Sequence, residues 1–153
     1  MLNDDGDIVH GLGFVTLYSA YIEEQIDNLI FLLNPIKAFG EDKQRWPVSR
    51  KINHAKKVLK SIEFDGREDL ISNLSTCKDL FENRNEFVHG RILANFDRPD
   101  TLKSGRPNTP DREVNSIELY NLANECNEFI SAIYRPTINK IPKAIEEYLN
   151  KKP

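Results

Sequence analysis

Apolar residues recur at intervals of three and four positions in separate segments of this chain, and this spacing constrains the fold most. It matches one face of an α-helix, so each segment can bury a stripe of side chains against its neighbours. The predicted helices span about residues 8–33, 48–61, 67–89 and 116–135, with a shorter one at about 142–150. We therefore expect an all-α fold, an antiparallel bundle of four to five helices.

Composition narrows the class of protein. The length of 153 residues suits a single domain, residues 1–153, with its core at about 8–135. A hydrophobic fraction of 39% and a charged fraction of 29% are typical of a globular protein. The net charge of -3 argues against a protein that coats duplex DNA, but it permits a local basic site. The start MLNDDGDI does not resemble a signal peptide and the most apolar window contains acids, so we expect a cytoplasmic protein with no membrane span.

Glycine, proline and serine predict where the helices end. Gly90 would end the third helix in a left-handed turn. Residues 91–115 are expected to form a long loop or, alternatively, a short hairpin that uses RILANF as one strand. Ser116 is expected to cap the fourth helix and Pro136 to end it. Pro142 suits the first turn of the last helix.

The second predicted helix has a basic face. Its members are Arg50, Lys51, Lys56, Lys57 and Lys60. Such a face is often simply solvated, but it can also guide a polyanion. Both interpretations stay open at this point.

The two cysteines, Cys77 and Cys126, lie far apart in the sequence and lack metal-ligand spacing. Both fall at predicted core positions of helices. We expect two buried free thiols, no metal site and no cofactor.

The segment ENRNEFVHGRI, residues 82–92, places Arg84, Asn85 and His89 at the end of the third predicted helix. On a helical wheel with about 100° per residue, these three side chains straddle the apolar stripe of Phe81 and Val88. Polar groups at such positions require a partner, because an unpaired buried polar group destabilises the fold.

A guanidinium at the position of Arg84 needs an anion. The anion could be Glu82, Glu86 or a carboxylate of the first helix, or it could be a phosphate, which a planar charged fork binds well. An imidazole such as His89 can exchange protons near neutral pH. No partner nucleophile is visible, so the pair favours phosphodiester chemistry in which the substrate supplies the nucleophile, as RNA does with its 2′-hydroxyl.

RNEFVH fits the R-N-x-x-x-H form of the R-x(4–6)-H motif, and the chain resembles the HEPN superfamily. The segments GFVTLYSAYIEEQIDNLI and SRKINHAKKVL are similar to the helices that precede the motif in that superfamily, so the resemblance covers about residues 8–135. It implies a dimeric helical bundle and a metal-independent endoribonuclease of a toxin–antitoxin or phage-defence system.

The resemblance also implies residue roles. Arg84 would stabilise charge on the phosphate, His89 would act as acid or base, and Asn85 would assist. Two copies of the motif would form a composite active site in a homodimer. The products would carry a 2′,3′-cyclic phosphate and a 5′-hydroxyl. We further expect the RNA substrate to contact these residues: Arg50, Lys51, Lys56 and Arg91.

Some HEPN proteins are inactive, so the alternative is a non-catalytic module for dimerisation or nucleic-acid binding. The chain contains no nucleotidyltransferase signature. Any antitoxin or regulatory protein of that type would be a separate partner.

Overall fold

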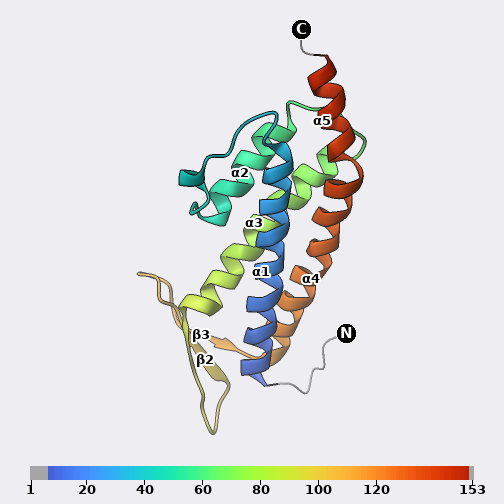
Figure 1. Ribbon diagram of the computed structural model, residues 1–153. Coiled ribbons are helices and arrows are strands. Elements are labelled where there is room, and N and C mark those ends of the chain that lie inside the picture. The colour runs from blue at the N-terminus through green and yellow to red at the C-terminus, as the bar shows by residue number, and fades with distance from the viewer. Residues whose placement is uncertain (1–6, 152–153) are drawn as a thin grey trace. The chain divides into compact units, whose positions relative to one another are not determined.

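Figure 1 shows the computed structural model of the chain, which describes residues 7–151. Residues 1–6, most of the segment used to predict the absence of a signal peptide, lie outside the described residues. The elements are α1 (Ile8–Leu33), the 3-10 helix η1 (Glu41–Lys43), α2 (Val48–Leu59), α3 (Arg67–His89), β1 (Arg91–Leu93), β2 (Asp100–Lys103), β3 (Arg112–Val114), α4 (Ser116–Asn139) and α5 (Ile141–Asn150). Within this range, no helix is long and apolar enough to cross a membrane.

The chain forms two compact units. The sheet unit comprises Met1–Ala20 and Asp79–Glu128, and the α2 unit comprises Tyr21–Lys78 and Phe129–Pro153. Helices α1, α3 and α4 each contribute to both units. Within the sheet unit, α3 runs opposite to α1 and α4, and the strands follow directly from its end (Figure 1).

The helices predicted from the spacing of apolar residues agree with the observed ones, and the predicted seams of α2 and α3 are largely buried. The expected seam of α3 is buried, with exposed fractions of 3% or less at its four members, Leu70, Leu74, Cys77 and Phe81. The α2 seam is likewise buried at Ile52, Ala55 and Leu59. Burial of these stripes supplies most of the stability of amphipathic helices, which are marginal in isolation.

The fold is mainly helical, as predicted, but the all-α prediction is wrong in one part, because the segment after α3 forms a three-stranded antiparallel sheet in the order β1-β2-β3. Ile92 pairs with Leu102, which pairs in turn with Arg112. Leu102 and Val114 are 1% and 3% exposed, so one face of the sheet joins the core. The hairpin alternative was closer, since β1 covers the first three residues of RILANF.

The prediction of a left-handed turn at Gly90 is also wrong. Gly66, before α3, has a positive φ of 85°, whereas Gly90 does not. A Cβ atom at Gly90 would lie 2.6 Å from the Glu86 carbonyl oxygen and 2.8 Å from Leu102 Cδ1. Glycine is therefore required because β2 packs closely against the last turn of α3.

The cap of α4 lies one residue earlier than predicted. Asn115 Oδ1 accepts a hydrogen bond from the backbone N of Glu118 at 3.0 Å, so Asn115 takes the capping role expected of Ser116. The prediction for Pro142 is confirmed, because it lies in the first turn of α5.

Pro136 does not end α4, which continues to Asn139. Proline removes one helical hydrogen bond, and this usually favours termination. Here Ile133 and Thr137 are 0% and 2% exposed on either side of Pro136. The Thr137 hydroxyl also donates to the Ile133 carbonyl oxygen at 2.7 Å. Burial on both sides of the proline keeps the segment helical.

Candidate functional site

Arg84 lies on the buried face of α3. Its neighbours three and four positions away on the helix include Leu80, Phe81 and Phe87, which are exposed by only 3–4%. Arg84 itself is half-buried. The buried face is therefore wider on this side than the predicted stripe, and Arg84 lies within it.

The guanidinium of Arg84 is only partly satisfied. Its Nη1 donates to Asn85 Oδ1 at 3.0 Å. Its Nε is buried and has no hydrogen-bond partner within residues 7–151. A buried donor without a partner destabilises the fold by about 1–3 kcal/mol. The permanently charged Arg84 guanidinium thus keeps an N–H donor that forms no hydrogen bond with the described residues.

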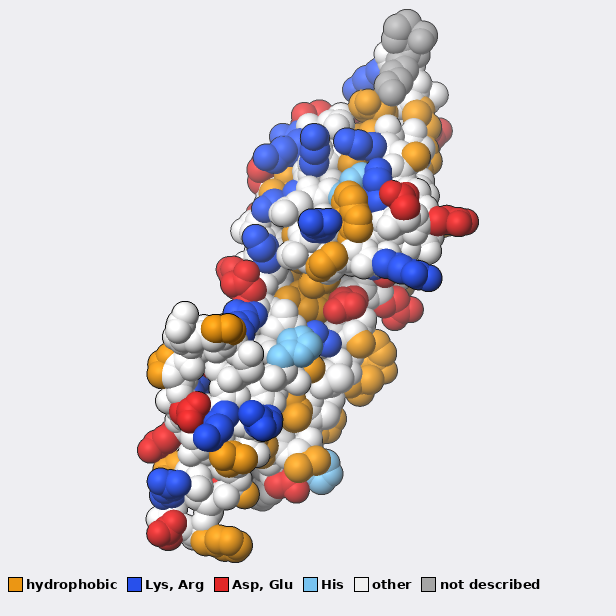
Figure 2. All heavy atoms as spheres, turned by 90° about the vertical axis from the view of Figure 1, so that its left-hand side faces the viewer, with side chains coloured by type: hydrophobic (Ala, Val, Ile, Leu, Met, Phe, Trp, Pro, Cys, Tyr) orange, Lys and Arg blue, Asp and Glu red, His pale blue; other side chains and the backbone are white. Residues whose placement is uncertain are grey.

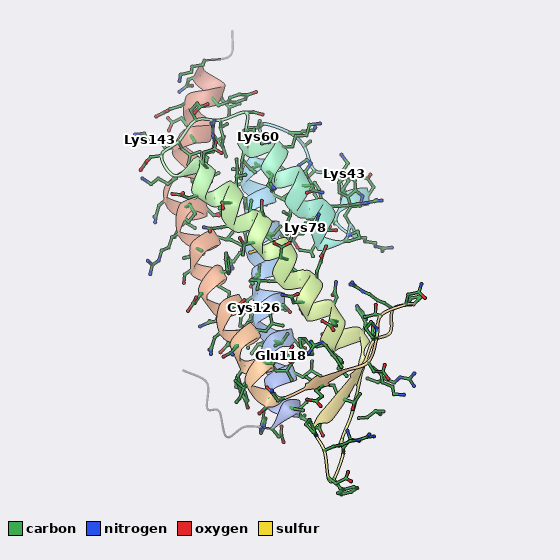
Figure 3. All side chains as sticks on the ribbon, turned by 180° about the vertical axis from the view of Figure 1, so that it is seen from behind. Lys43, Lys60, Lys78, Glu118, Cys126 and Lys143 are labelled. Atoms are coloured by element: carbon green, nitrogen blue, oxygen red, sulfur yellow. The ribbon has the colours of Figure 1, made fainter. Side chains whose placement is uncertain are left out.

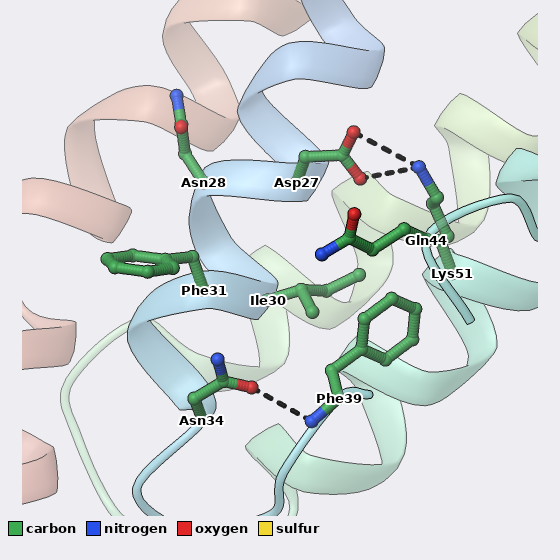
Figure 4. Close-up of a pocket in the computed structure, with 8 residues that line it drawn as sticks. All are labelled: Asp27, Asn28, Ile30, Phe31, Asn34, Phe39, Gln44 and Lys51. Atoms are coloured by element: carbon green, nitrogen blue, oxygen red, sulfur yellow. Dashed lines mark hydrogen bonds and ion pairs between the residues drawn. The ribbon is translucent and has the colours of Figure 1, made fainter. Parts of the chain in front are cut away.

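No carboxylate of residues 7–151 forms an ion pair with Arg84. Glu86, one of the acids expected to pair with Arg84, binds Arg112 Nε at 2.8 Å. Asp27, a carboxylate of the first helix, binds Lys51 Nζ at 2.7 Å (Figure 4). The ion-pair alternative for Arg84 is therefore not realised among these residues.

The charge of Arg84 acts on the thiol of Cys126 in α4. Burial, followed by the Glu125 carboxylate, raises the pKa of Cys126 to about 11, and Arg84 partly opposes this shift. Cys126 and Cys77 are both buried, as predicted, and neither forms a disulfide. The charge of Arg84 is therefore close enough to α4 to act on the Cys126 thiol.

Arg112 holds the end of α3 in place, a role that no pattern in the sequence predicts. Its guanidinium bonds Glu86 on α3 at 2.8 Å and Glu118 on α4 at 2.7 Å. It also lies 5.3 Å from the ring centroid of Phe87. The hydrogen bond to Glu86, and to a smaller extent the one to Glu118, raises the pKa of Arg112 above its usual range. Arg112 thus joins β3 to both helices beside the motif.

His89 is the last residue of α3 and is exposed. A Cβ atom at Gly105 would lie 2.6 Å from the His89 carbonyl oxygen, so the loop after β2 packs on the helix end. Five helical positions separate His89 from Arg84, which turns their side chains about 140° apart. Among residues 7–151, no hydrogen bond joins His89 to Arg84 or Asn85. One chain brings Arg84 and Asn85 together, but not His89.

The four residues predicted to contact the RNA differ in whether their side chains are available to bind it. Arg91, in β1, and Arg50, in α2, are exposed. Lys51 is occupied by its ion pair, and Lys56 Nζ donates to Ser75 Oγ at 2.6 Å. Lys51 and Lys56 therefore stabilise the α2 unit, and the exposed Arg50 and Arg91 remain candidates for RNA contacts.

A cavity of about 820 Å³ lies in the sheet unit next to the motif. Its lining is mainly apolar and includes Phe87, Val88 and Ile92. Arg84, Asn85 and His89 do not line it. The cavity therefore offers an apolar surface at the end of α3 and not the charged centre itself.

Comparison of the chain with family models, curated protein sequences and solved structures finds no significant match. Residues 7–151 hold no group of three or more His, Cys, Asp or Glu side chains placed to bind a metal. Function is therefore inferred from the residues of this chain.

Proposed function

We propose that this protein is an endoribonuclease that cleaves RNA without a metal, using Arg84, Asn85 and His89. One observation carries the proposal. Arg84 is half-buried among apolar neighbours, has no carboxylate partner among residues 7–151, and keeps a buried Nε without a hydrogen bond. A scissile phosphate would supply the missing anion and accept from the free donor.

The chemistry follows from these three side chains. The 2′-oxygen of the RNA loses its proton to a base and attacks the adjacent phosphorus, and the 5′-oxygen leaves with a proton. His89 is exposed and can serve as that acid or base. Arg84 stabilises the charge that develops on the phosphate, and Asn85 orients Arg84 through their 3.0 Å hydrogen bond. The products are a 2′,3′-cyclic phosphate and a 5′-hydroxyl.

A homodimer supplies the geometry that one chain lacks. Arg84 and His89 point about 140° apart on one helix, so a two-fold axis beside α3 can place His89 of one copy near Arg84 of the other. An enzyme with such a site would suit a toxin or phage-defence effector, controlled by a separate antitoxin or regulatory protein.

The test uses purified protein, single-stranded RNA and excess EDTA. We expect cleavage of RNA, and no cleavage of DNA or of 2′-O-methylated RNA, because both lack the nucleophile. Arg84→Ala and His89→Ala should each lower the rate about a hundredfold or more, which corresponds to about 3 kcal/mol. Arg135→Ala, an exposed arginine of α4 outside the site, is the matched control and should keep full activity. Equal RNA decay by the wild type and all three variants would indicate a contaminating ribonuclease and would contradict the assignment of the site to Arg84 and His89.

The non-catalytic module is the second candidate, and the Arg84–Asn85 hydrogen bond within one chain favours it. In that case the motif would only stabilise an interface. No cleavage of any tested RNA by the wild type, together with loss of the dimer in His89→Ala, would support the module over the enzyme.

A further inference from the structure

A second basic site lies in the α2 unit, in a cavity of about 400 Å³. Its walls come from the segment after α1, from η1 and the turn after it, and from α2. The lining residues are Lys37, Lys43, Trp46, Arg50, Asn53, His54 and Lys57. Four of these side chains are cations and none is a carboxylate.

The four cations are not neutralised by the described chain. None of them forms an ion pair with a carboxylate of residues 7–151, whereas neighbouring Lys51 is paired with Asp27. Lys and Arg side chains gather over α2 and the segment before it (Figure 2). Like charges around one cavity repel each other, and a bound anion would relieve that repulsion.

The pKa of His54 reflects the charges around this cavity. Burial is the main factor that lowers the pKa of His54. The positive charges of Lys37, Lys43 and Lys57 lower it further. Its Nε2 is buried and has no hydrogen-bond partner among the described residues. The part of this pKa shift that comes from the three lysines reflects a positive potential, which favours a negative ligand.

The aromatic residues hold two of these cations in place. Lys43 Nζ and the Arg50 guanidinium carbon lie 5.7 Å and 5.9 Å from the ring centroid of Trp46. Phe39 packs edge-on against Trp46 at 5.7 Å and also contacts His54 at 4.9 Å. Lys43 and Arg50 are thus positioned before any ligand binds, which reduces the entropy lost on binding.

We propose that this cavity binds a compact polyanion with two or more linked phosphate groups, as in a nucleoside triphosphate or an inorganic polyphosphate. Four cations that converge on one cavity match the several negative charges of such a ligand. An extended strand would instead require cations in a line. A volume of about 400 Å³ is also within the range of small-ligand sites. The site contains none of Arg84, Asn85 and His89, and it shares only Arg50 with the candidate RNA contacts.

Trp46 makes the site directly measurable, because it is the only tryptophan of the 153-residue chain. The full-length protein is titrated in EDTA with tripolyphosphate, ATP, adenosine and a single-stranded DNA, while fluorescence and calorimetry report binding. We expect saturable binding of tripolyphosphate and ATP, and none of adenosine. Equal affinity for the two ligands would assign the site to the polyphosphate group alone. Tighter binding of ATP would show that the nucleoside also contributes.

Variants of the cavity lysines test whether these residues bind the polyphosphate. Lys37→Gln combined with Lys57→Gln should weaken binding of tripolyphosphate and ATP by about tenfold or more, because two charges are lost without altering the contacts of Trp46. Lys60→Gln removes a lysine at the end of α2 that does not line the cavity, and it should bind like the wild type (Figure 3). Absence of binding by both methods, equal binding by the double variant, or binding of DNA but not of tripolyphosphate would overturn the proposal.

Discussion

At the scale of single residues, Arg84 lies on the same helix face as the buried residues Leu80, Phe81 and Phe87. Its Nε is buried and has no hydrogen-bond partner among residues 7–151. A charge in such a place lowers stability, so Arg84→Met should leave the free energy of unfolding unchanged or raise it by about 1 kcal/mol. The same change should lower RNA cleavage about a hundredfold or more. Urea unfolding and cleavage assays on one preparation measure both effects. A clear loss of stability would instead assign Arg84 a structural role.

Cys126 gives the protein a pH dependence in alkaline solution. Its folded-state pKa of about 11 exceeds the ordinary value of 9.0. The unfolded state therefore loses the thiol proton first, so this stabilisation is complete below about pH 9 and declines as pH rises towards 11. Two pKa units correspond to about 3 kcal/mol. Urea unfolding of the wild type and Cys126→Ala between pH 8 and pH 11 measures the effect, because other titrations are common to both proteins. A parallel decline in the two proteins would contradict it.

At the scale of elements, Arg112 connects β3 to α3 and α4. Arg112→Met removes the contacts with Glu86 and Glu118, which are partly exposed, so we expect a loss of about 1–2 kcal/mol in the free energy of unfolding. Because Glu86 lies between Asn85 and Phe87 on α3, the last turn of that helix should also become more mobile. Amide exchange at residues 84–89 checks this, with Lys103→Met, which breaks only a 3.7 Å ion pair in the same sheet, as the control. Unchanged exchange would show that the helix end does not depend on Arg112.

At the scale of the whole molecule, the proposed composite site requires two copies of the 17.7 kDa chain. Light scattering at micromolar concentration should therefore give a dimer. Mixing the inactive Arg84→Ala and His89→Ala proteins should restore cleavage to at least about tenfold above either variant, because mixed dimers hold one intact Arg84 and one intact His89. A monomer, or no restoration despite subunit exchange, would contradict the composite site.

The helices were predictable from sequence because their signals are local. A period of three and four positions, a proline in the first turn of α5 and a polar run at the end of α3 depend only on neighbours along the chain. For the same reason the positions of Arg84, Asn85 and His89 on their helix followed from counting residues. The cap of α4 was predicted one residue away from Asn115, since adjacent Asn and Ser are both good caps.

Tertiary structure decided what depends on distant segments. The strands are short, and Leu102 stabilises them only because it reaches the core. Gly90 is needed for the approach of β2, although the sequence favoured a left-handed turn. Which acid binds which base was likewise undetermined, because Glu86 could serve Arg84 or Arg112 and only the folded position of β3 selects Arg112. The amino-acid sequence was sufficient to predict the helices and the polar residues on them. That Arg84 has no acid partner among residues 7–151 depends instead on packing in three dimensions, because through-space contacts are not encoded in spacing along the chain.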